Sequence, residues 1–140
     1  MDDTLVNYGG EIERLPPEIL LKYEGRLDEV PGIFSKMEPM PDAIESFKVL
    51  SEKFDTYILS TPPWGNPMGA AEKFDWVKHH LGSFAYKRLI LSHHKHLNHG
   101  NFLVDDRKVN GAEKFNGELI LFGSENFQNW RVVTSYLLSK

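Results

Sequence analysis

The chain has 140 residues, of which 41% are hydrophobic and 26% are charged, and it contains no cysteine. This length suffices for one domain with a buried core and is too short for two, so we expect a single domain spanning residues 1–140. The net charge of −4 gives no general attraction to nucleic-acid polymers or anionic membranes, and no apolar stretch approaches the ~18 residues of a membrane span. The acidic start is unlike a signal peptide, and the lack of cysteine fits a cytoplasmic protein.

Residues 6–40 have an irregular pattern. Pro16 and Pro17 interrupt the segment, and Pro17–Tyr23 predicts a short helix. Pro31-Gly32 marks a turn. We interpret residues 6–40 as a small, mostly helical insertion and a candidate lid.

From Pro41 onward, helices with apolar residues at spacings of three and four alternate with short apolar runs. Such runs are typical of strands that are buried on both faces of a parallel sheet. In chain order, the predicted elements are a helix from Pro41 to about Phe54, a strand at 56–60, a helix at about 70–81 with Phe74, Val77 and Leu81 facing inwards, strands at 88–92, 102–105 and 118–122, and a helix at 126–139. This alternation predicts an α/β fold of three layers with a mostly parallel sheet.

Each predicted strand ends in polar residues, and the pair Asp105-Asp106 is the most informative of these ends. Open α/β sheets bind ligands outside the carboxyl ends of their strands. Adjacent carboxylates repel each other unless a cation lies beside them, and a hard cation such as Mg²⁺ prefers oxygen ligands. Taken alone, the pair suits a solvated turn after a strand equally well.

Four short motifs occur in one order along the chain. They are Asp2-Asp3-Thr4-Leu5, Leu59-Ser60-Thr61-Pro62, Glu72-Lys73-Phe74-x-Trp76-Val77 and Leu103-Val104-Asp105-Asp106-Arg107. Together they resemble the 5'(3')-deoxyribonucleotidase branch of the haloacid dehalogenase (HAD) superfamily. The resemblance covers the first few residues and most of the chain from Pro31 onward, and it is weak across 9–30. It implies a Rossmann-like sheet, a small helical cap, and Mg²⁺-dependent hydrolysis of nucleoside monophosphates through an aspartyl-phosphate.

The resemblance also implies roles for individual residues. Asp2 matches the acid/base aspartate, which protonates the leaving alkoxide and then activates water, and it is also a candidate metal ligand. Lys73 matches the lysine that neutralises the phosphate, although an isolated helical lysine is usually a solvated surface residue. The remaining matches are Ser60 and Thr61 as phosphate-binding hydroxyls, Lys95 as a further phosphate contact, and Asp105 and Asp106 as the metal pair, with Asp105 the favoured direct ligand.

The N-terminal motif departs from the family pattern. The family motif is Asp-x-Asp-x-Thr/Val, and Met1 falls at its first x, so the matching nucleophilic aspartate and its strand would precede Met1. A late start codon, a truncated chain and a degenerate protein are the three explanations. We therefore expect these 140 residues alone not to form the aspartyl-phosphate, and we expect the sheet to lack its first central strand. Either another segment fills that gap, which leaves exchange within a homodimer open, or residues precede Met1.

The aromatic and histidine residues suggest two further sites. His93, His94, His96 and His99 lie in one loop, but without cysteine or a second cluster a polar loop is favoured over a zinc site. Trp64, beside the phosphate loop, is the better aromatic candidate for the substrate side, whereas Trp76 is expected in the core. Weaker candidates for a base pocket are Tyr8, Phe34 and Met37.

The leading hypothesis is a Mg²⁺-dependent phosphatase that acts on a small phosphomonoester, most specifically a deoxynucleoside monophosphate. A HAD-like phosphatase for another small phosphomonoester, such as a sugar phosphate, is one alternative. A non-catalytic module that retains the phosphate and metal sites is the other. The preferences for base, for sugar and for the 5' or 3' position stay open.

Overall fold

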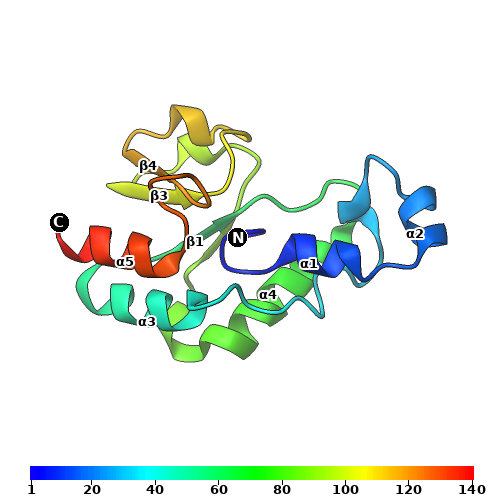
Figure 1. Cartoon of the computed structure of the whole chain (residues 1–140), viewed down its shortest axis with the longest axis horizontal. Helices are drawn as coiled ribbons and strands as arrows, with labels where there is room; N and C mark the ends of the chain where they lie inside the picture. Colours follow the sequence, from blue (N-terminus) through cyan, green and yellow to red (C-terminus); the bar gives the residue numbers. More distant parts are fainter.

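The computed structural model describes all 140 residues as an α/β protein (Figure 1). Its helices and strands are α1 (Tyr8–Glu13), α2 (Pro17–Lys22), α3 (Ala43–Lys53), β1 (Ile58–Ser60), α4 (Pro67–Leu81), β2 (Leu89–Leu91), β3 (Phe102–Asp105), β4 (Glu118–Leu121) and α5 (Trp130–Leu138). Short 3₁₀ turns connect several of them, at Leu27–Glu29, Gly82–Ala85, Lys95–Leu97 and Ala112–Lys114. None of the helices is long and apolar enough to cross a membrane.

The strands form two separate parallel pairs. β1 pairs with β2 in a register that places Leu59 opposite Ile90, and β3 pairs with β4 in a register that places Val104 opposite Ile120. No strand of the chain lies between β1 and β3 to join the pairs. The expected α/β class with parallel strands is confirmed, and the interrupted sheet agrees with the expected lack of a central strand.

The helices bury their apolar faces against these strands and against one another. α3 packs on both α4 and α5, and in Figure 1 α3 and α4 lie together on one side of the strands. α4 begins with Pro67, whose fixed backbone angle suits the first turn of a helix, and it ends before Gly82, which has a φ of 52°. Most of the buried core residues form a single hydrophobic cluster.

Three details of the predicted helices were wrong. α4 begins at Pro67, three residues earlier than predicted, and Phe74 does not face inwards because it is 52% exposed. α5 begins at Trp130 and not at residue 126. The Asn129 side chain accepts a hydrogen bond from the Val132 N–H, which caps the helix and fixes its first turn there.

The N-terminal residues run through the middle of the molecule (Figure 1). Thr4 is buried, and its carbonyl accepts a 2.7 Å hydrogen bond from Trp130 Nε1. Val6 forms isolated bridges to Asp2 and to Pro39. These contacts tie residues 2–6 to α5 and to the segment before α3, which fixes the position of Asp2.

Residues 6–40 contain α1, α2 and a 3₁₀ turn. The helix predicted at Pro17–Tyr23 is confirmed, apart from its last residue. In Figure 1, α2 lies at the far end of the molecule from β3 and β4. The role of this segment as a cap over substrate stays a prediction.

Candidate active site

Lys73 lies at the centre of the candidate site. It projects from α4, and its side chain has no exposed surface. Nζ donates three hydrogen bonds: to Asp2 Oδ2 at 3.0 Å, to Ser60 Oγ at 2.9 Å and to the Thr61 carbonyl at 2.8 Å. Burial lowers the pKa of Lys73, while the Asp2 carboxylate opposes that shift. All three ammonium protons are directed at named acceptors, so the position of the charge is fixed.

The segment around Phe34 covers this lysine. The Phe34 ring centroid lies 4.6 Å from Lys73 Nζ, a cation–π contact. The Phe34 N–H donates to Glu72 Oε2 at 3.1 Å, and Trp76 Nε1 donates to the Met37 carbonyl at 2.7 Å. The segment at 34–37 is therefore attached to the same turns of α4 that carry Lys73.

Sequence reasoning missed the contact between Phe34 and Lys73 and the role of Glu72. Phe34 lies in a segment without hydrophobic periodicity, so the sequence gives no indication that it contacts Lys73. The one sequence feature that could have indicated a role for Glu72 is its position beside Lys73 in the motif. Phe34 and Met37 are buried, and Tyr8 stacks on Phe34 with ring centroids 5.9 Å apart. Phe34 and Met37 therefore present no exposed face on which a nucleobase could stack.

A second cluster follows β3. Asp105 is buried and forms an ion pair with buried Lys95. Burial raises the pKa of Asp106 to about 6, and a hydrogen bond with Asp105 adds to the shift. Arg107 Nε lies 3.4 Å from Asp106 Oδ2, which confirms the expected pairing of Arg107 with a nearby carboxylate.

The amino group of Met1 interacts with charged residues of both clusters. It is buried, and burial lowers its pKa; Asp2 and Asp105 oppose this shift, whereas Lys95 and Lys73 add to it. Charged residues of both clusters therefore lie near one buried amino group, at the carboxyl ends of β1 and β3. This is the edge of the sheet where parallel strands place their functional residues.

The carboxylate oxygens of this region are the kind of ligand that a hard cation such as Mg²⁺ prefers. Asp2 Oδ1 is buried and has no hydrogen-bond partner, and Asp105 and Asp106 share a hydrogen bond that a bound cation would replace. No three His, Cys, Asp or Glu side chains already converge on one point. Mg²⁺ commonly takes only one or two carboxylates, with water and phosphate oxygens as its other ligands. Asp2, Asp105 and Asp106 are the residues that would hold it.

The other predicted residues occupy different surroundings. Thr61 Oγ1 donates a hydrogen bond to the Ser92 carbonyl at 3.1 Å, so this hydroxyl stabilises the chain at the end of β2. Trp64 is 89% exposed, and its ring centroid lies 5.7 Å from that of His93. Trp76 is buried, as expected of a core residue. The structure thus brings the predicted residues together in two groups. The first group is Asp2, Ser60, Thr61 and Lys73. The second group is Lys95, Asp105 and Asp106, whereas Trp64 lies on the surface apart from both.

Comparison with known proteins supports one family. Residues 20–134 match the family described as "5' nucleotidase, deoxy (Pyrimidine), cytosolic type C protein". A protein of Vibrio phage KVP40 is 52% identical over 140 residues, which are 100% of this chain and 82% of the relative. A Bordetella parapertussis protein is 35% identical over 116 residues, 74% of this chain and 62% of the relative. Both carry the name "Putative 5'(3')-deoxyribonucleotidase".

A human relative, named "5'(3')-deoxyribonucleotidase, cytosolic type", is 35% identical over 89 residues, which are 61% of this chain and 44% of the relative. The family match covers most of the chain, including Lys73, Lys95 and the Asp105-Asp106 pair, and the phage relative extends the similarity to Asp2. The chain therefore belongs to the 5'-nucleotidase family of HAD-type phosphoric monoester hydrolases.

Proposed function

We propose that the protein acts on deoxynucleoside monophosphates as a Mg²⁺-dependent phosphatase of the 5'(3')-deoxyribonucleotidase type. The observation that carries the proposal is the buried ammonium of Lys73, held by Asp2 and Ser60 at the carboxyl end of β1. A fixed positive charge at such an edge stabilises a phosphoryl group, because phosphoryl transfer depends chiefly on positioning and charge neutralisation. The names of the relatives support the nucleotide substrate. The proposed compartment is the cytoplasm.

Each residue has a distinct part in this proposal. Lys73 neutralises the charge of the phosphate, and Ser60 Oγ, which accepts a hydrogen bond from Nζ, keeps its own proton free to donate to the same group. In this proposal Asp2, whose side chain is 23% exposed, gives a proton to the leaving alkoxide and takes one from water. Bound Mg²⁺ would supply further charge neutralisation at the phosphate from the Asp105-Asp106 side.

The attacking carboxylate of the covalent route matches no position within these 140 residues, since Asp2 takes the acid/base position of the motif. A non-catalytic binding module is the second candidate function, and the observation that favours it is that all three N–H groups of Lys73 already have protein acceptors.

One experiment separates these possibilities. Binding of deoxynucleoside monophosphates and sugar phosphates would be measured by calorimetry with Mg²⁺ and with EDTA, and phosphate release would be measured in parallel. We expect Lys73→Met to weaken nucleotide binding at least tenfold, whereas Lys36→Met, at an exposed lysine, leaves it unchanged. A variant with an apolar strand and an aspartate fused before Met1 tests the attacking group.

Release by the fused variant alone would support the phosphatase. Binding without release in either form would support the module. A preference for sugar phosphates, or nucleotide binding that is unchanged in Lys73→Met, would overturn the assignment of nucleotide as substrate or of Lys73 as the phosphate-binding residue.

A further inference from the structure

Glu72 lies next to Lys73 on α4, but its side chain is directed elsewhere. Adjacent residues of a helix do not face each other, so the Glu72 carboxylate does not point at Lys73. The only hydrogen bond of the Glu72 side chain comes from the Phe34 N–H, at 3.1 Å from Oε2. The amides on either side, those of Ile33 and Ser35, donate to carbonyls of their own turn. Glu72 therefore supplies the acceptor that the Phe34 N–H does not find in its own turn.

The ring that this hydrogen bond holds in place covers the ammonium of Lys73. Phe34 is 2% exposed, and its ring centroid lies 4.6 Å from Lys73 Nζ. A Cβ atom on Gly69, one helical turn before Lys73, would lie 3.1 Å from Cδ2 and Cε2 of the ring. The ring therefore lies directly against the backbone of α4, which the absence of a side chain at Gly69 permits. Tyr8 stacks on the same ring.

Other side chains hold the two ends of residues 28–37. Asn66 Nδ2 donates to the carbonyl at the first of these residues at 3.0 Å, and Trp76 Nε1 donates to the carbonyl at the last of them at 2.7 Å. Phe34 lies between these two attachments, and Glu72 holds it there. Loss of the Glu72 acceptor would therefore release the middle of the segment while both of its ends stay attached.

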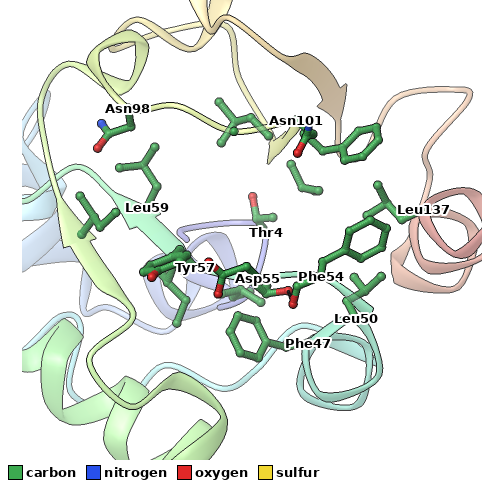
Figure 2. Close-up of a pocket in the computed structure, with 18 of the residues that line it drawn as sticks. Thr4, Phe47, Leu50, Phe54, Asp55, Tyr57, Leu59, Asn98, Asn101 and Leu137 are labelled. Carbon is green, nitrogen blue, oxygen red and sulfur yellow. Dashed lines mark hydrogen bonds between the residues drawn. The ribbon is translucent and has the colours of Figure 1, made fainter. Parts of the chain in front are cut away.

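The cavities of the molecule lie apart from Lys73. The cavity drawn in Figure 2, of about 650 Å³, is lined by residues such as Thr4, Leu59 and Leu137, and by none from α4 or from residues 28–37. A cavity of about 300 Å³ borders Glu72 but neither Phe34 nor Lys73. This arrangement agrees with the complete burial of the Lys73 side chain, to which the Phe34 ring contributes.

We propose that Glu72 is a positioning residue of the candidate site, whose carboxylate holds the Phe34 backbone so that the Phe34 ring stays over the ammonium of Lys73. A ring in this place excludes water and leaves Nζ with its three protein acceptors. The positive charge is then already in place when a phosphate arrives, and less ordering is needed on binding. This inference rests on the proposed binding of phosphate by Lys73 and names the residue that prepares Lys73 for it.

Two substitutions in the 140-residue protein separate the hydrogen bond of Glu72 from its charge. Glu72→Gln keeps an oxygen acceptor at the same reach and loses the charge. Glu72→Asp keeps the charge and withdraws the acceptor by one methylene group. Asp75→Asn, at an exposed position of the same helix, is the matched control. A positioning role through Phe34 predicts that Glu72→Gln behaves like the wild type and that Glu72→Asp does not.

Two measurements follow the consequence for Lys73. The first is the NMR shift of the Lys73 methylene protons, which the ring current of Phe34 moves upfield of those of exposed Lys36. The second is the affinity for inorganic phosphate, measured by calorimetry with Mg²⁺. In Glu72→Asp we expect most of the upfield displacement to be lost and phosphate to bind about tenfold more weakly. In Glu72→Gln and Asp75→Asn we expect both quantities to stay close to those of the wild type.

Phe34→Leu tests whether Glu72 acts through the ring. It removes the ring and keeps the backbone N–H, and we expect about the same tenfold loss of phosphate affinity. Combined with Glu72→Asp it should lose no more than either variant alone, because both act through one ring. Additive losses would overturn the proposal, as would an unchanged Lys73 shift in Glu72→Asp, or equal losses in Glu72→Asp and Glu72→Gln. If the wild type binds no phosphate, the proposed function fails, while the Lys73 shifts still decide whether Glu72 positions the ring.

Discussion

Replacing Lys73 by methionine tests whether the buried ammonium is held by Asp2. The substitution removes three hydrogen bonds from a charged donor, each of which contributes about 1.5–3 kcal/mol, and the cation–π contact with Phe34. It also removes the desolvation penalty of an ammonium that has no exposed surface, which is several kcal/mol in the opposite direction. The Asp2 carboxylate left behind is 23% exposed and therefore partly solvated. We expect a net loss of about 2 kcal/mol in the free energy of unfolding.

A double-mutant cycle with Asp2→Asn isolates the pair. Urea unfolding followed by tryptophan fluorescence would give the free energy of unfolding of wild type, both single variants and the double variant. We expect a coupling energy of about 2 kcal/mol, because each single variant leaves one charge without its partner. Lys36→Met, at an exposed lysine, is the control and should stay within about 0.5 kcal/mol of wild type. A coupling energy below about 0.5 kcal/mol would refute the reasoning, since Asp2 and Lys73 would then not depend on each other.

Three other results follow from the structure. Burial raises the pKa of Tyr8 from 10.0 to about 12. The stability that the neutral Tyr8 side chain contributes is therefore complete below pH 10 and is lost as the pH rises towards 12. Tyr8→Phe should reduce this alkaline loss when the free energy of unfolding is measured against pH. Gly117→Ala would place a Cβ atom 2.3 Å from the backbone oxygen of Gly100. We expect this clash to lower the free energy of unfolding, measured by urea titration, by about 3 kcal/mol. A loss under about 0.5 kcal/mol would contradict the contact. Asp105→Asn should weaken Mg²⁺ binding at least tenfold by calorimetry, whereas Asp75→Asn, at an exposed position of α4, should not; equal affinities would remove Asp105 from the metal site.

Periodicity predicted the existence of most elements but failed at the functional helix. A pattern rule places Phe74 inside and Lys73 outside, whereas Lys73 has no exposed surface and Phe74 is 52% exposed. Within α4 the buried positions are Gly69, Lys73, Trp76, Val77 and Leu81, a continuous stripe that includes the lysine. The local rule fails here because a charged side chain occupies a core position, where Asp2 and Ser60 compensate for its burial.

The motifs identified the residues of the candidate site, but they could not predict which of these residues contact one another. Asp2, Ser60 and Lys73 are far apart in the sequence, and no spacing argument gives the 3.0 and 2.9 Å bonds that join them. The contact from Phe34 to Lys73 came from a segment with no regular pattern at all. The gap in the sheet, in contrast, was predicted from the motif frame alone, because Met1 falls at the first x of the motif and the strand that carries the preceding aspartate is therefore missing from the expected sheet.

The hydrogen bond from Trp130 to Thr4 has a consequence for the order of folding. It joins residues 126 positions apart, close to the full length of the chain. Contacts of such separation form late, because a long loop must close before they contribute any stability. During synthesis on the ribosome, residues 2–6 therefore remain without this anchor until α5 has emerged. The candidate site therefore has all of its N-terminal contacts only after α5 has been made.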